Sequence, residues 1–70
     1  MEDSPERHLE AAIRHEAAAS SHERAANFWD AQGDVERSAL QRDLVNHERQ
    51  GAELERRWAA LIERETAASD

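Results

Sequence analysis

The chain has 70 residues, room for one small domain, and its core should be thin because 14 residues are Ala while Leu, Ile, Val and Phe together number ten. The absence of Cys excludes a disulfide scaffold, a thiol nucleophile and a Cys-ligated zinc or iron–sulfur site. The net charge of -7 argues against binding to nucleic acid, which requires clustered positive charge on the protein.

A first helix is predicted to begin near Pro5. Ser4 can cap the free N–H groups of the first turn, Pro suits the first helical position, and Glu6 faces the positive end of the helix dipole. Nothing interrupts the helical pattern until the dipeptide Gly33-Asp34, so this helix should extend to about residue 32.

A tight turn is predicted at residues 33–34, because Gly can adopt the left-handed conformation that ends a helix and Asp can cap the next one. A second helix should then cover about residues 35–66, with Gly51 as its internal weakness and the small, polar tail 67–70 frayed. A turn this short forces the helices to lie antiparallel. We therefore expect a single all-α domain over residues 1–70, folded as an antiparallel two-helix hairpin.

Residues three and four positions apart form one stripe on the second helix, and we expect this stripe to be its main buried face. The stripe comprises Leu40, Leu44, His47, Gly51, Leu54, Trp58, Leu61 and Ile62. The facing stripe of the first helix is small and partly polar: Ala11, Ala12, Ala18, Ala19, Ala25, Ala26 and Trp29, interleaved with His8, His15 and His22. Ala lets two helix backbones approach closely, so the large side chains of the second helix should fill the space between them.

A weaker apolar stripe on the far side of each helix predicts self-association. Its members are Ile13, Ala17, Phe28 and Ala31 on the first helix and Val45, Ala52 and Ala59 on the second. A lone hairpin with so few large apolar residues hardly offsets about 1.5 kcal/mol of ordering entropy per residue, so we expect a homodimeric four-helix bundle. The expected interface residues are Leu40, Leu44, Leu54, Trp58, Leu61, Ile62, Ile13, Phe28 and Trp29. The alternatives are a partner protein that completes the core, a marginal monomer, and a segment that folds only on a partner.

Three histidines of the first helix recur every seven residues, which places them on one helix face but about 10 Å apart along the axis, too far for one shared metal ion. Counting outward from the turn predicts which residues of the second helix they face. The expected neighbours are Trp58 for His8, Gly51 for His15, and Leu44 and His47 for His22.

A metal site is the alternative function of this face. Asp43 and His47 have the four-residue spacing of a one-helix chelate, and His22 should reach them across the hairpin. Two His and one carboxylate with an open position suit zinc or a similar divalent transition metal. The competing interpretation is that the histidines only hydrogen-bond to neighbouring side chains or water.

The position of the histidines between the helices also predicts a pH effect. A neutral His on a buried seam resists taking a charge, so its pKa should be depressed and the assembly should weaken as the pH falls through about 6.5. A neighbouring carboxylate, such as that of Glu16, Glu23 or Glu48, would stabilise the charged form and reverse the sign.

Catalysis is not expected, since the sequence has no Gly-rich phosphate loop, no nucleophile elbow, and neither the His-Glu-x-x-His nor the Glu-x-x-His metal motif. No apolar run approaches the roughly 18 residues of a membrane span, and the acidic start lacks the features of a signal peptide, so a cytoplasmic location is expected. We therefore predict a non-catalytic acidic hairpin that self-associates and acts as a protein–protein interaction, adaptor or regulatory module without a cofactor.

Overall fold

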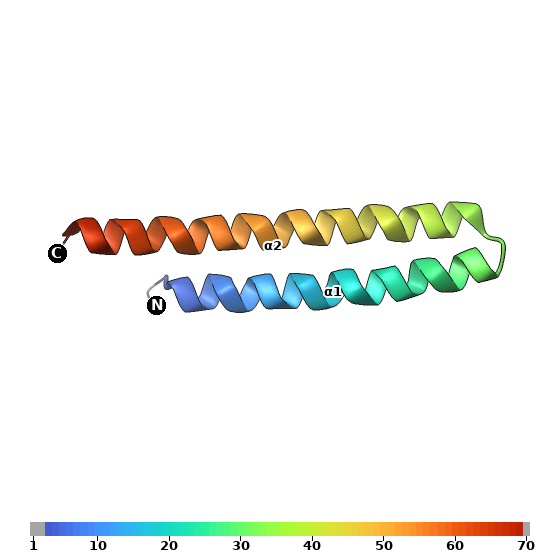
Figure 1. Ribbon diagram of the computed structural model, residues 1–70, viewed down its shortest axis with the longest axis horizontal. Coiled ribbons are helices and arrows are strands. Elements are labelled where there is room, and N and C mark those ends of the chain that lie inside the picture. The colour runs from blue at the N-terminus through green and yellow to red at the C-terminus, as the bar shows by residue number, and fades with distance from the viewer. Residues whose placement is uncertain (1–2, 70) are drawn as a thin grey trace.

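The computed structural model describes residues 3–69, which form two helices packed side by side as an antiparallel hairpin (Figure 1). Helix α1 runs over Pro5–Ala31 and α2 over Val35–Ser69, so the predicted all-α hairpin is confirmed. The molecule is a rod with extents of 57 × 15 × 14 Å. Residues 67–69, which were expected to fray, continue α2, and Asp70 lies outside the described residues. Neither helix carries, within residues 3–69, a stretch long and apolar enough to cross a membrane.

Local capping defines the first residue of α1. Ser4 has extended backbone angles (φ −135°, ψ 152°), and its Oγ accepts a hydrogen bond from the backbone N–H of Arg7 at 3.4 Å. Pro5 occupies the first turn, where its missing N–H has no intrahelical partner to lose. The start predicted from Ser4 and Pro5 is therefore confirmed.

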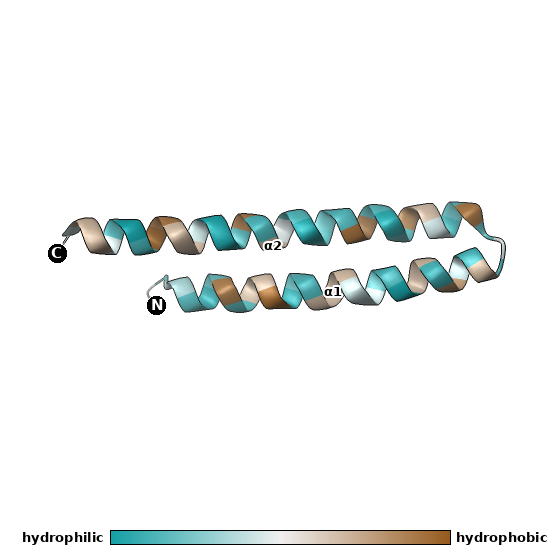
Figure 2. Cartoon of the chain, viewed as in Figure 1, coloured by the Kyte–Doolittle hydropathy of each residue, from teal (hydrophilic) through white to brown (hydrophobic). Residues whose placement is uncertain are grey.

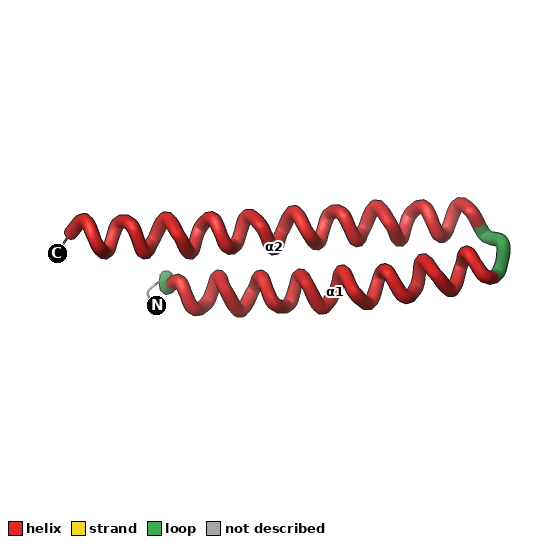
Figure 3. Tube along the Cα trace, in the orientation of Figure 1, coloured by secondary structure: helices red, strands yellow, loops and turns green. Residues whose placement is uncertain are grey.

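The turn that joins the two helices is drawn as a short loop in Figure 3. Backbone hydrogen bonds close it. The N–H of Asp34 donates to the carbonyl of Trp29 at 2.9 Å, and the N–H of Gly33 donates to that of Asp30 at 3.0 Å, the pair of bonds that forms a Schellman motif. Gly33 has a φ of 75°, in the left-handed region where a Cβ would be strained, as its predicted role requires. Because the turn takes only residues 32–34, α2 returns along α1.

Side chains stabilise the same turn. Asp34 accepts from the backbone N–H of Arg37 at 2.9 Å, which caps α2, and from the Arg37 guanidinium at 2.5 Å. These two bonds lower the pKa of Asp34 below its ordinary value of 3.8. Asp30 accepts from the hydroxyl of Ser38 at 2.5 Å and from Arg42, which lowers its pKa in the same way. The Asp34 carboxylate therefore caps the start of α2, and the Asp30 carboxylate holds that start against the end of α1.

The buried core is a seam of small residues spaced seven apart on each helix. Its members are Ala12, Ala19 and Ala26 on α1 and Ser38, Val45, Ala52 and Ala59 on α2. A seven-residue period is that of a left-handed coiled coil, in which one face of each helix stays in contact along the rod. Small side chains on both sides let the backbones approach closely. Within residues 3–69, every buried side-chain nitrogen and oxygen has a hydrogen-bond partner.

The predicted buried face of α2 is wrong, because its large residues from Leu40 to Leu61 are exposed. The stripe that was expected to face outward, Val45 with Ala52 and Ala59, packs against α1 instead. Both stripes have helical spacing, and hydrophobic bands recur between hydrophilic ones along both helices (Figure 2). Side-chain size decides between them, since a large residue in the place of Ala52, which is 0% exposed, would hold the helices apart.

Candidate interaction surface

One edge of the hairpin is formed by a histidine layer, which we define as His8, His15, His22 and Trp29 of α1, all half-buried. The ring of His8 stacks on Trp58, with centroids 4.8 Å apart and planes 13° apart. The ring of His15 lies against Gly51. The neighbours predicted for these two histidines are therefore confirmed. At the turn, the guanidinium of Arg37 lies over the ring of Trp29, 5.1 Å from its centroid.

Each histidine of the layer also hydrogen-bonds to α2 through its Nδ1 atom. The pairs are His8–Glu55 at 2.5 Å, His15–Glu48 at 2.8 Å and His22–Gln41 at 2.7 Å. The acceptors are oxygens, so Nδ1 carries the proton and donates. None of these three pairs is predicted from the sequence, where Glu48 is considered only as the neighbour of His47 along the chain. The signal was present, since Gln41, Glu48 and Glu55 repeat every seven residues, as the histidines do.

His8 has a carboxylate at each ring nitrogen, since its Nε2 lies 2.6 Å from Oδ1 of Asp3. Both nitrogens can donate only when the ring is protonated. The hydrogen bond to Glu55 is the largest effect on this ring; with the bond to Asp3 it outweighs desolvation and raises the pKa of His8 above 6.5. The predicted depression of the pKa is therefore wrong for His8, because carboxylates from outside α1 stabilise the charged ring.

The other edge of the hairpin carries a second set of contacts with the same period. The ion pairs there are Glu16–Arg56 at 2.6 Å, Glu23–Arg49 at 3.1 Å and Asp30–Arg42. Their side chains are about half exposed, so each pair contributes at most about 1 kcal/mol. The charged side chains of these three pairs are therefore neutralised within the hairpin.

The three residues predicted to bind metal do not form a cluster. His22 is half-buried and bonded to Gln41, whereas Asp43 and His47 are exposed. In the part of the chain that the structure describes, no group of three or more His, Cys, Asp or Glu side chains is arranged to hold a metal ion.

Most of the large apolar side chains of α2 lie in a second seven-residue pattern, which we call the outer seam. The outer seam consists of Leu40, Leu44, His47, Gly51, Leu54, Trp58 and Leu61, alternately four and three residues apart. Its four Leu side chains and its Trp are between 40% and 63% exposed. This is the spacing of a coiled-coil face, yet the large side chains of this face remain substantially exposed within residues 3–69. Trp58 and Gly51 connect the outer seam to the histidine layer.

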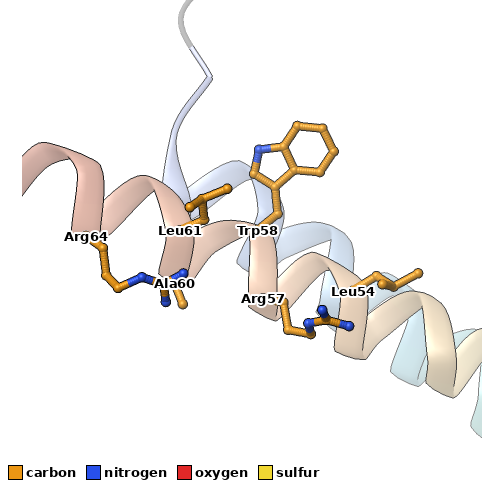
Figure 4. Close-up of a pocket in the computed structure, with 6 residues that line it drawn as sticks. All are labelled: Leu54, Arg57, Trp58, Ala60, Leu61 and Arg64. Atoms are coloured by element: carbon orange, nitrogen blue, oxygen red, sulfur yellow. The ribbon is translucent and has the colours of Figure 1, made fainter.

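Near the end of α2, the outer seam borders an open hollow of about 360 Å³ (Figure 4). The residues that line this hollow are Leu54, Arg57, Trp58, Ala60, Leu61 and Arg64. Arg57 and Arg64 extend to a different side of α2 from Trp58 and Leu61. Neither arginine has an ion-pair partner within residues 3–69, in contrast to Arg49. The apolar surface therefore has a positively charged margin that the hairpin does not neutralise.

Compared with protein families, with curated proteins and with solved structures, the chain gives no match in any of the three.

Proposed function

We propose that this chain is a non-catalytic helical hairpin that self-associates through the outer seam and serves as a protein–protein interaction module. One observation carries the proposal: the residues buried inside the hairpin are small, whereas the large apolar residues of the outer seam are exposed. The core is made of Ala, Ser and one Val, whereas Leu40, Leu54 and Trp58 are each more than half exposed.

The energetics favour association of such a molecule. Burying a Leu side chain that was in water contributes about 1.5–3 kcal/mol, and the outer seam offers four Leu and one Trp. A hairpin core built mainly of Ala provides little of this free energy within one chain. Covering the outer seam would therefore stabilise the hairpin and create the complex in one step.

A homodimeric four-helix bundle is the simplest arrangement that covers this surface. Two hairpins with their outer seams in contact would bury both copies of each Leu, in a core of the kind found in helix bundles. Ile13 and Phe28, which are 68% and 55% exposed on α1, would then be left to contact a different protein or to lie at the edge of the bundle.

The proposal is tested by sedimentation equilibrium of the Leu54→Glu variant beside Ala39→Glu. Both changes place a carboxylate at an exposed position of α2, but Ala39 is not part of the outer seam. We expect Leu54→Glu to weaken self-association by at least about 100-fold, because each dimer loses two buried Leu side chains, and Ala39→Glu to leave it nearly unchanged. Equal masses for the two variants would contradict the proposal.

A further inference from the structure

We infer that the occupant of the outer seam is a second copy of this chain whose α2 lies antiparallel to the first. This inference rests on the proposed function and adds to it the identity, direction and register of the partner. Two independent patterns on α2 lead to it, one in the apolar residues of the outer seam and one in the charges along its margin.

The apolar pattern matches itself when α2 is reversed. In antiparallel coiled coils, residues that stand four and three apart on one helix meet the same pattern running in the opposite direction. Aligning the outer seam with a reversed copy places Leu40 opposite Trp58, Leu44 opposite Leu54, and His47 opposite Gly51. In the first two of these pairs, large apolar residues face large apolar residues; the space beside Gly51 in the third pair is taken by His15 of the same chain. A two-fold axis produces each of these pairs twice.

The charge pattern also complements itself when α2 is reversed. A row of exposed residues seven apart borders the outer seam: Glu36, Asp43, Gln50, Arg57 and Arg64. The row is negative at its start, neutral in the middle and positive at its end. In the same antiparallel alignment Asp43 meets Arg57 of the second copy and Glu36 meets its Arg64. None of these four charged residues has an ion-pair partner within residues 3–69.

A parallel alignment also brings the large apolar residues together, each against its own copy, but it does not provide the charge matches. In parallel coiled coils the margin on one side of the seam meets the opposite margin of the partner. On α2 the opposite margin carries Gln41, Glu48, Glu55 and Ile62, two of whose carboxylates are already bonded to histidines. Asp43 would face acidic residues there and gain no basic partner. The antiparallel direction is therefore favoured by charge.

Single cysteines distinguish the two directions, because the natural chain contains none. We expect oxidation of a mixture of the Leu44→Cys and Leu54→Cys variants to form the mixed disulfide, and each variant alone to remain reduced. In the antiparallel register the two copies of residue 44 lie about 15 Å apart along the axis, beyond the reach of a disulfide. Efficient cross-linking of Leu44→Cys to itself would overturn the antiparallel direction.

Charge reversal provides a second measurement that leaves every apolar residue in place. We expect Asp43→Arg and Arg57→Asp each to weaken dimerisation by roughly 5-fold and the double variant to recover most of that loss. Glu10→Arg, an exposed change of the same charge on α1, is the matched control and should have little effect. A double variant as weak as the product of the single variants would overturn the register.

The mass of the natural chain separates failure of this inference from failure of the proposed function. A dimer whose Leu44→Cys variant cross-links to itself would overturn only the antiparallel direction. A chain that stays monomeric would overturn both.

Discussion

His15 occupies the space that a side chain at Gly51 would need. A Cβ built on Gly51 would lie 2.8 Å from Cε1 and 2.9 Å from Nδ1 of His15, closer than such atoms approach in folded proteins. The ring is held there by its hydrogen bond to Glu48. Gly51 is therefore the point at which α2 makes room for the histidine layer.

This contact predicts a strong coupling between residues 15 and 51. In an exposed helix, Gly→Ala stabilises by about 1 kcal/mol, so Gly51→Ala should stabilise the chain by that amount when His15 is already replaced by Ala. In the natural chain the same change must displace the ring from Glu48, and we expect the gain to vanish or become a loss. Urea unfolding of the four variants measures the coupling. An equal gain in both backgrounds would show that His15 and Gly51 do not interact.

The raised pKa of His8 predicts a stability contribution that depends on pH. A group whose pKa is higher in the folded state contributes fully below its unfolded pKa, near 6.5, and loses that contribution as the pH rises through the folded value. The melting temperature of the natural chain should therefore exceed that of His8→Gln by more at pH 6 than at pH 8.5. Titration of the His8 ring by NMR should give a midpoint above 6.5 that moves down in Glu55→Gln. A midpoint below 6.5 in the natural chain would be evidence against the charged contact.

The small-residue core predicts intolerance to larger side chains at Ala52. Adding three carbons at this fully buried position should push the helices apart and lengthen the hydrogen bonds of the histidine layer, so Ala52→Leu should destabilise by about 1–3 kcal/mol. Ala39→Leu is the matched control, because Ala39 is exposed on the same helix and should tolerate the change within about 0.5 kcal/mol. Thermal unfolding followed by circular dichroism compares the two. Equal melting temperatures would contradict the assigned core.

The start of α1 and the turn between the helices were predictable because their signals are local, whereas the continuation of α2 to Ser69 was not predicted. Ser4 and Pro5 start α1, and Gly33 with Asp34 ends it and starts α2, through contacts within a few residues along the chain. The antiparallel arrangement follows from the shortness of the turn. The neighbours of His8 and His15 on α2 follow from this arrangement, because counting outward from Gly33 along both helices identifies them.

The choice of buried face was not predictable from α2 alone. Leu44 and Val45 are neighbours that belong to two stripes with the same helical period, and hydrophobicity favours the stripe with more Leu. What decides is a property of the pair of helices: both contribute small buried residues to the contact, such as Ala26 on α1 and Ala52 on α2, and the histidines form short hydrogen bonds to α2. Which residue becomes a hydrogen-bond partner of a histidine, such as Gln41 for His22, depends on the direction of both side chains, and spacing along one helix does not encode that direction.

The mass of the natural chain in solution tests the central claim most directly. Sedimentation equilibrium with chelator at pH 7.5, from about 1 μM to about 1 mM, covers the range in which an association of ordinary strength appears. Self-association through the outer seam predicts a mass that rises with concentration to twice the chain mass of 8.0 kDa. A helical chain that stays at 8.0 kDa throughout would contradict it.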